Sequence, residues 1–224
     1  VRITVATRRS ALALAQSRAV AAALQAAGHE PALLEITTTG DRWSLAGSGA
    51  QPGMDVKGMF VKELEEALLD GRADIAVHSA KDLPGEMPPG LAVIATPPRE
   101  DPGDVLVGSP DGLEGLAMGA RVGTTSPRRR AQVLAARPDL DVVEIRGNVD
   151  TRLAKLDAGE VDALLLASAG LNRLGIARAD AVRLPFGVCL PAAGQGIVAI
   201  EGRDGDAEVR AACATLDDTA ARAC

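Results

Sequence analysis

The amino-acid sequence predicts an α/β protein of two lobes, each built from a mixed sheet with flanking helices. Strand-like and helix-like segments alternate along most of the chain, which is typical of this fold class. Two segments rich in Pro and Gly, residues 96–105 and 190–196, interrupt the alternation and predict two crossings between lobes. With 47% apolar residues in 224, the chain can bury a core in each lobe.

The first lobe is predicted from two helix patterns and four strand patterns. Ser10 is a suitable N-cap for the first helix and Gly28 a suitable stop, while Gly71 ends the second. The predicted helices are 11–28 and 60–71, and the predicted strands are 2–7, 33–39, 73–77 and 91–98. Residues 40–58 are rich in Gly and Ser without periodicity, and a loop of this length in a compact domain is expected to be either a lid or disordered.

The second lobe continues the alternation, and the chain then returns to the first lobe. Predicted strands are 120–126, 141–147 and 161–169, and predicted helices are 127–136 and 149–159, followed by a short segment at 170–175. A strand at 197–202 and a helix at 206–216 would belong to the first lobe. The expected domains are therefore 1–98 with 195–217, then 99–194, with 218–224 as the start of a third domain.

Composition argues against several classes of function. The formal net charge of −6 and the 1% aromatic content disfavour binding to nucleic acid. Three cysteines without a C-x-x-C spacing and two distant histidines predict neither a disulfide framework nor a metal site. No apolar run reaches transmembrane length, and the start lacks the apolar core of a signal peptide. The expectation is a cytoplasmic protein that binds no metal, nucleic acid or membrane.

Arginine recurs where a predicted strand meets a predicted helix. Arginines lie beside the expected N-caps Ser10, Ser126 and Asn148, as residues 8–9, 128–130, 146 and 152. A helix N-terminus carries a partial positive charge, so arginine there is locally unfavourable unless an anion is bound. The planar guanidinium binds carboxylates in a bidentate manner. Solvated basic turns would explain any one junction, but three at strand ends favour a polyanion site.

Several ligands and roles remain open at this point. The segment "GTTS" lacks the spacing of a phosphate-binding P-loop, and "GQG" is not a dinucleotide fingerprint, so several carboxylates fit as well as phosphates. Asp82 follows a buried strand beside Lys81. It could balance charge structurally, or exchange a proton with a substrate amine and stabilise a developing cation. His78 is predicted to be a packed strand histidine rather than part of a Ser–His pair.

The sequence resembles the porphobilinogen deaminase family, also called hydroxymethylbilane synthases. The matching stretches are "ATRRSALALAQS", "KGMFVKELEEALLDGRADIAVHSAKDLP", "PPREDPGDVLV", "VGTTSPRRRAQVLAARPDL", "IRGNVDTRLAKLDAGEVDALLLASAGLNRLG" and "LPAAGQGIVAIEGR". They cover nearly all of residues 3–203 in the family's order. The resemblance implies two lobes similar to type II periplasmic binding proteins, with a third small domain.

The resemblance also implies a transferase of tetrapyrrole (haem) biosynthesis. Four porphobilinogen molecules would be joined head to tail into hydroxymethylbilane, with release of ammonia, by a cytoplasmic monomer. Asp82 would be the catalytic acid, and Phe60 would lie at the end of the lid. The residues that would bind carboxylates of the substrate and cofactor are Arg8, Ser10, Lys57, Ser79, Lys81, Ser126, Arg128, Arg129, Arg146, Arg152, Arg173 and Gln195.

The family's cofactor is a dipyrromethane held through a thioether to a cysteine in a Gly-Gly-Cys loop. Cys224 has no such context, and Cys189 and Cys213 lie in apolar surroundings typical of packed residues. We therefore expect the attachment cysteine beyond residue 224 and the 224-residue chain alone to be inactive. Two alternatives are a non-catalytic two-lobed binder of small polycarboxylates and a truncated form that binds substrate without turnover.

Overall fold

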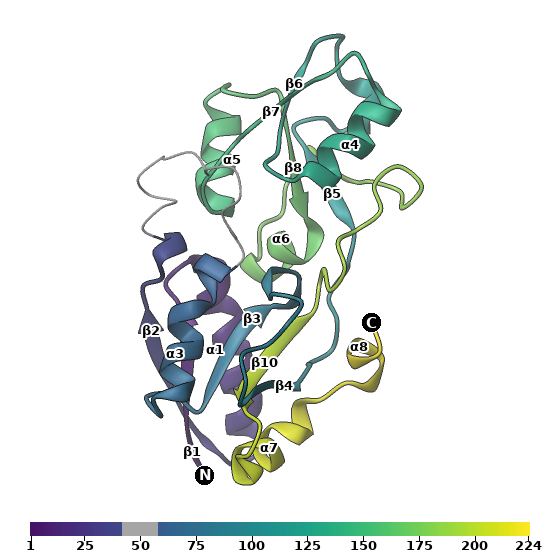
Figure 1. Ribbon diagram of the computed structural model, residues 1–224. Coiled ribbons are helices and arrows are strands. Elements are labelled where there is room, and N and C mark those ends of the chain that lie inside the picture. Colours follow the sequence, from purple (N-terminus) through teal and green to yellow (C-terminus); the bar gives the residue numbers. More distant parts are fainter. Residues whose placement is uncertain (42–57) are drawn as a thin grey trace. The chain divides into compact units, whose positions relative to one another are not determined.

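A computed structural model describes residues 1–41 and 58–224 (Figure 1). The chain forms two compact units. Unit 1 comprises Val1–Glu100 and Ile197–Cys224, and unit 2 comprises Asp101–Gly196. Among the residues that the structure describes, each unit contains one five-stranded sheet. Assignment of 218–224 to a further domain stays a prediction.

Unit 1 has the strand order β2-β1-β3-β10-β4. These strands are β1 (Arg2–Arg8), β2 (Glu30–Ile36), β3 (Ile75–Ser79), β4 (Leu91–Ala95) and β10 (Val198–Arg203). The first three run parallel, whereas β10 is antiparallel to both of its neighbours, so the sheet is mixed. The carboxyl ends of β1 and β3 therefore lie at the same edge.

Helices cover both faces of this sheet because its strands alternate their buried side chains. Ile3 and Val5 of β1 join the core beneath α1 (Ala11–Ala26) and α7 (Ala207–Cys213), whereas Ala6 joins the core beneath α3 (Lys62–Leu69). Ser10 caps α1 as predicted, with its Oγ accepting a hydrogen bond from the Ala13 amide at 3.3 Å. A short helix, α8 (Thr219–Arg222), ends the chain.

Unit 2 has the strand order β7-β6-β8-β5-β9. These strands are β5 (Asp104–Val107), β6 (Arg121–Gly123), β7 (Asp141–Val143), β8 (Ala163–Ala167) and β9 (Ala181–Arg183). Strands β6, β7 and β8 are parallel, and β5 is antiparallel to β8, with Asp104 opposite Ala167. The start of β5 thus lies at the edge where the parallel strands β6, β7 and β8 end.

Three helices flank the second sheet. Val122, Val133 and Leu165 belong to the core on the side of α4 (Pro127–Ala136). Leu153, Leu164 and Leu171 belong to the core on the side of α5 (Val149–Asp157) and α6 (Ser168–Leu174). The alternation of Leu164 and Leu165 between the two cores is the two-residue period of a strand buried on both faces.

The predicted fold class is confirmed, with three corrections to the elements. The predicted crossing at 96–105 overlaps β5, which begins at Asp104, and β9 was not predicted from the sequence. The strands have four and three residues, so they lack a period long enough to recognise. The predicted strand 141–147 is shorter than expected because β7 pairs with only three residues of β6.

Candidate active site

In unit 1 the predicted site residues lie at the carboxyl ends of two neighbouring parallel strands. Arg8 ends β1 and is followed by Ser10, the cap of α1. Ser79 ends β3, and Lys81 and Asp82 lie on the single 3-10 turn Ala80–Asp82 that follows it. The Lys-Asp pair thus lies directly after β3, where the sequence analysis placed it, and the roles of these residues stay predictions.

The Lys81–Asp82 turn is anchored by its backbone. The Ala80 amide donates to the carbonyl of Ile197 at 3.0 Å, and the Leu83 amide donates to the carbonyl of Ala80 at 3.2 Å. Lys81 and Asp82 are both half-buried. A carboxyl on a short, hydrogen-bonded turn has a fixed position while its side chain can still meet a ligand, as proton transfer requires.

Arg8 is held by the segments that precede and follow residues 42–57. Its Nε donates to Asp41 Oδ1 at 3.1 Å, and its guanidinium carbon lies 4.2 Å from the centre of the Phe60 ring. Burial raises the pKa of Asp41, but the bonds and charge of Arg8, with bonds from Thr38, outweigh it and lower that pKa overall. Lys57, also predicted to bind carboxylates, lies outside the described residues.

Two side chains on β3 have buried partners. Ser79 Oγ accepts a hydrogen bond from Gln16 Nε2 of α1 at 3.0 Å. His78 is buried and its Nε2 lies 2.9 Å from Oε2 of Glu201 on β10. The prediction that His78 is a packed strand histidine is therefore confirmed.

In unit 2 the predicted residues also gather at one sheet edge. Ser126, the cap of α4, follows β6, and its Oγ accepts a hydrogen bond from the Arg129 amide at 3.4 Å. Arg146 follows β7, and Arg152 lies in α5 just beyond it. Arg173 lies in α6, which follows β8 directly. Parallel strands bring these separate parts of the sequence to one edge, where ligands of such sheets bind.

Arg128 and Arg129 both bind Asp104, the first residue of β5. Arg128 Nη2 donates to Asp104 Oδ2 at 2.7 Å, and Arg129 Nη2 donates to Oδ1 at 2.6 Å. Gln195 Nε2 donates to the same Oδ1 at 2.8 Å. Burial raises the pKa of Asp104, but the charge and hydrogen bonds of Arg129, with bonds from Gln195 and Arg128, outweigh it and lower that pKa overall.

The other arginines at this edge also have partners within unit 2. Arg146 Nη2 donates to Glu144 Oε2 at 3.0 Å, and Arg152 Nε donates to the carbonyl of Gly147 at 2.7 Å. Arg173 Nη2 donates to the carbonyl of Gly196 at 2.7 Å. These bonds fix the guanidinium positions, and the binding of substrate carboxylates by these arginines stays a prediction.

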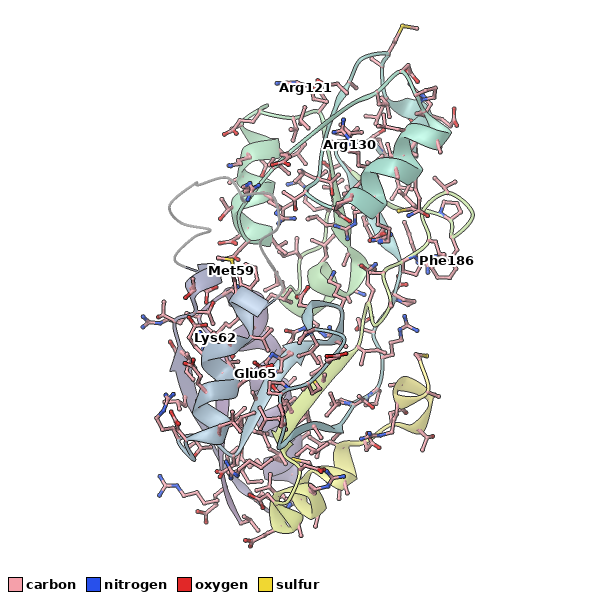
Figure 2. The ribbon with its side chains drawn as sticks, viewed as in Figure 1. Met59, Lys62, Glu65, Arg121, Arg130 and Phe186 are labelled. Atoms are coloured by element: carbon pink, nitrogen blue, oxygen red, sulfur yellow. The ribbon has the colours of Figure 1, made fainter. Side chains whose placement is uncertain are left out.

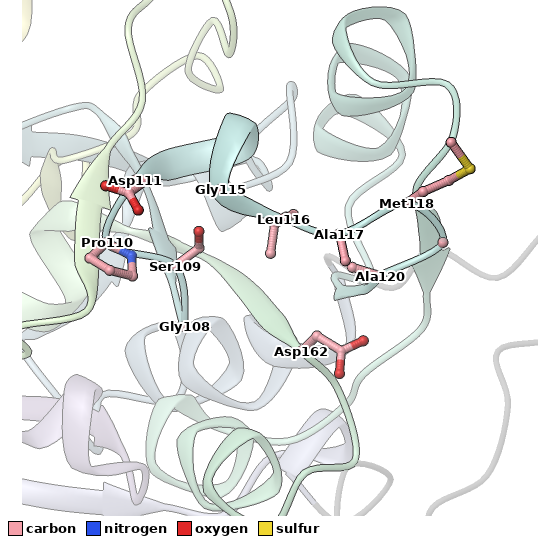
Figure 3. A pocket seen from close by; sticks show the side chains of 11 residues that line it. Gly108, Ser109, Pro110, Asp111, Gly115, Leu116, Ala117, Met118, Ala120 and Asp162 are labelled. Carbon is pink, nitrogen blue, oxygen red and sulfur yellow. The ribbon is translucent and has the colours of Figure 1, made fainter.

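A cavity of about 510 Å³ in unit 2 lies away from this arginine-bearing edge (Figure 3). Its lining includes Gly108, which follows β5, and Asp162, which precedes β8. Because β5 and β8 are antiparallel, these residues mark the opposite edge of the sheet. The lining also includes Ser109, Leu116 and several glycines but no arginine, so it does not suit a polycarboxylate.

The sequence did not single out the acceptors that hold these basic side chains. Asp41, Asp104 and Glu144 bind the arginines, and Glu201 lies against His78. Asp104 begins a short strand in a segment that the sequence predicted to be a crossing. No local pattern of apolar residues therefore predicted that Asp104 is buried. A carboxylate within an apolar "DVLV" stretch could have been recognised as requiring a buried cation.

The three cysteines differ in accessibility, which predicts a difference in reactivity. Cys189 and Cys213 are buried and Cys224 is exposed. Burial raises the pKa of both buried thiols to about 11, and a bond to Asp104 adds to the effect at Cys189. Because the thiolate is the nucleophile, we expect iodoacetamide at pH 8 to modify Cys224 and to leave the other two intact, as measured by peptide mass spectrometry. Equal modification of all three in the folded protein would contradict this assignment.

Carboxyl groups bound to arginine predict a loss of stability in acid. The hydrogen bond from Arg183 is the largest cause that lowers the pKa of Asp101 to about 2. The pKa of Asp41 and that of Asp104 are also lowered. The unfolded pKa of an aspartate is about 3.9, and a folded pKa below this value means that ionisation stabilises the fold. The full contribution is present above the unfolded pKa and is lost as pH falls through the folded pKa. We expect the free energy of unfolding to decrease between pH of about 4 and 2.

Urea unfolding followed by circular dichroism at successive pH values measures this decrease. Asp101→Asn should flatten the slope in this range because the amide does not titrate. A slope unchanged in Asp101→Asn would show that Asp101 does not contribute to it.

Within residues 1–41 and 58–224, no cluster of three or more His, Cys, Asp and Glu side chains could hold a metal ion. In the same ranges no helix has the length and apolar character needed to cross a bilayer.

The fold is similar to those of solved structures of other proteins. A periplasmic substrate-binding protein of an ABC transporter from Coxiella burnetii matches 99% of this chain and 94% of its own length, with a TM-score of 0.55 and 14% identity. The reduced OxyR regulatory domain from Pseudomonas aeruginosa matches 100% of this chain and 98% of its own, with a TM-score of 0.52 and 16% identity. At these identities the likeness concerns the fold alone.

Comparison of the sequence with known proteins identifies the family, which the likeness of folds does not. The family model described as "Porphobilinogen deaminase, dipyromethane cofactor binding domain" matches residues 3–211. The porphobilinogen deaminase of Roseiflexus castenholzii is 49% identical over 99% of this chain and 73% of its own length. That of Sorangium cellulosum is 52% identical over 99% of this chain and 74% of its own length. The chain belongs to the porphobilinogen deaminase family.

Proposed function

We propose that this protein is a transferase that condenses four porphobilinogen molecules into hydroxymethylbilane and releases ammonia at each condensation. The observation that carries the proposal is the gathering of Ser126, Arg128, Arg146 and Arg152 at one edge of the unit 2 sheet. Each pyrrole of such a chain carries two carboxylates, and guanidinium groups are the side chains best suited to bind them. The membership of the family supports the same activity.

Asp82 supplies the acid–base step of this proposal. It lies on the turn after β3, four residues beyond the buried His78. Its carboxyl group would protonate the departing amine of porphobilinogen, so that ammonia leaves as a neutral molecule. The resulting carboxylate would then offset positive charge on the pyrrole methylene carbon and accept a proton from the pyrrole that attacks it. The acid is restored in the same cycle.

The residues of unit 2 fit a dipyrromethane, the cofactor of this family. Arg128 and Arg129 share one carboxylate, Asp104, so the three side chains together retain a positive charge near the sheet edge. Arg146 and Arg152 lie at the same edge. When bound, the cofactor supplies the pyrrole carbon to which the first substrate is joined. The protein's own residues would hold its carboxylates and orient its two rings.

The attachment cysteine is the part of the proposal that the described thiols do not supply. Cys189 and Cys213 are buried and have raised pKa values, so neither fits a nucleophile that must form a thioether. Cys224 lacks the Gly-Gly context of the family. We therefore keep the proposal that attachment occurs on a cysteine outside residues 1–224, and that the polypeptide 1–224 tested alone binds substrate without turnover.

Incubation with porphobilinogen tests the activity. We expect the cofactor-bearing protein to release one ammonia per porphobilinogen consumed and to form hydroxymethylbilane, whereas the polypeptide 1–224 alone should release none. Saturable substrate binding without ammonia release by the cofactor-bearing protein would instead support the non-catalytic binder of polycarboxylates. The proposal includes a cytoplasmic monomer without nucleic-acid or membrane partners, and light scattering during gel filtration tests its oligomeric state.

A further inference from the structure

Asp104 is at the centre of a buried polar cluster, which we define as Asp104, Arg128, Arg129, Cys189 and Gln195. Asp104 itself is completely buried. Its Oδ1 accepts from Arg129 Nη2 at 2.6 Å and from Gln195 Nε2 at 2.8 Å. Its Oδ2 accepts from Arg128 Nη2 at 2.7 Å and from Cys189 Sγ at 3.2 Å. The carboxylate therefore contacts four side chains from distant parts of unit 2.

The cluster as defined has an excess of one positive charge. Two guanidinium groups face one carboxylate, whose lowered pKa keeps it ionised at neutral pH. The amide of Gln195 is neutral, and Cys189 stays protonated because its pKa is raised to about 11. Arg129 is buried and paired with Asp104 through two nitrogens, so the excess charge resides on the more exposed Arg128. The excess charge is thus suited to a ligand carboxylate where the cluster meets solvent.

The two arginines are not equivalent in their access to solvent. The Arg129 side chain is 8% exposed, and it also donates to the carbonyl of Leu165 in the sheet at 3.0 Å. The Arg128 side chain is 26% exposed. Its Nη2 donates to the buried Asp104 and its Nη1 to the carbonyl of the exposed Leu190, so both terminal nitrogens of its guanidinium have a partner. Asp104, which is held in place by the buried Arg129, therefore contacts Arg128 from the interior side.

We infer that Asp104 is a positioning residue, which acts on substrate binding through Arg128. The inference rests on the proposed function, in which Arg128 binds a pyrrole carboxylate. Asp104 would fix the plane of the Arg128 guanidinium before substrate arrives, so that no rotamer freedom is lost on binding. Gln195, a predicted ligand of substrate, would support the same carboxylate from a second side.

A double-mutant cycle with Asp104→Asn and Arg128→Met in the cofactor-bearing protein tests this coupling. We expect each single variant to raise the KM for porphobilinogen about tenfold, the usual effect of losing one charge-assisted hydrogen bond. Because the carboxylates are bound in both the ground state and the transition state, kcat should change less than about threefold. The double variant should have the KM of Arg128→Met alone, since Asp104 has nothing left to position.

Asp139→Asn is the matched control, because it removes a carboxylate that binds Arg137 beyond the other end of α4, at 2.7 Å. Its KM should equal that of the unchanged protein. If Asp104→Asn does not fold, the cycle is repeated with Asp104→Glu, which keeps the negative charge but moves the carboxylate from the position that holds Arg128. Failure of both forms to fold would assign Asp104 to stability alone and overturn the inference.

The outcomes separate this inference from the proposed function. An unchanged KM in Arg128→Met would refute the binding of a substrate carboxylate by Arg128, and the inference would fall with it. A raised KM in Arg128→Met with an unchanged KM in folded Asp104→Asn would overturn only the positioning role. Additive effects in the double variant would likewise show that Asp104 does not act through Arg128.

Discussion

Replacement of Asp82 by alanine is expected to lower kcat for porphobilinogen consumption by about a thousandfold or more. The variant loses both the proton donor to the leaving amine and the negative charge that offsets the developing cation, and each contribution is large in such sites. Asp82 lies half-buried on a turn that is held by backbone hydrogen bonds. The fold should therefore persist, with a melting temperature close to that of the unchanged protein.

Stopped assays of porphobilinogen consumption and bilane formation measure this effect. Glu66→Gln is the control, since Glu66 is an exposed carboxylate of α3 in the same unit and should leave kcat unchanged. Near-normal bilane formation by Asp82→Ala would remove Asp82 from the mechanism. Loss of the circular dichroism signal would instead show that the turn depends on the carboxylate.

Replacement of Arg129 by methionine is expected to lower the free energy of unfolding by about 3 kcal/mol, because it leaves a buried carboxylate without its main partner. Arg129 binds Asp104 with both Nε, at 3.1 Å, and Nη2, at 2.6 Å. Asp104 would keep Arg128, but that side chain is more exposed and cannot fill the position of Arg129. Urea unfolding followed by circular dichroism measures the change.

Arg121→Met provides the comparison for a solvent-exposed ion pair. Arg121 lies on β6 in the same sheet (Figure 2). It forms an ion pair with Asp162, and each of the two side chains is about half exposed. Such pairs contribute less than about 1 kcal/mol. A loss in Arg129→Met no greater than that in Arg121→Met would mean that the Asp104 cluster contributes little to stability.

The fold was predictable where a segment has a long period or a cap. The helix that begins after Ser10 and the strand that ends at Ser79 both follow from local chemistry. Strands β5 and β9 could not be predicted, because four and three residues provide no period and their place in the sheet depends on pairing with β8 and with each other.

The candidate site was predictable on its basic side and not on its acidic side. Arginine at a helix N-terminus is unfavourable next to the positive end of the helix dipole, so its presence there predicts an anion-binding site. No local sequence pattern marks the aspartates that bind those arginines. Asp41 and Arg8 are separated by 33 positions, and Asp104 and Arg129 by 25, so each pairing depends on the tertiary fold.

The place of β10 in unit 1 determines the order in which the chain can fold during its synthesis. β10 lies between β3 and β4, yet it is made about a hundred residues after β4. Until it leaves the ribosome, both neighbouring strands have edges without a partner, and such edges promote aggregation. Unit 2 is one continuous stretch, Asp101–Gly196, and needs no later residue for its sheet. Unit 2 can therefore fold before β10 of unit 1 has been synthesised. This reverses the usual order, in which the N-terminal domain folds first on the ribosome.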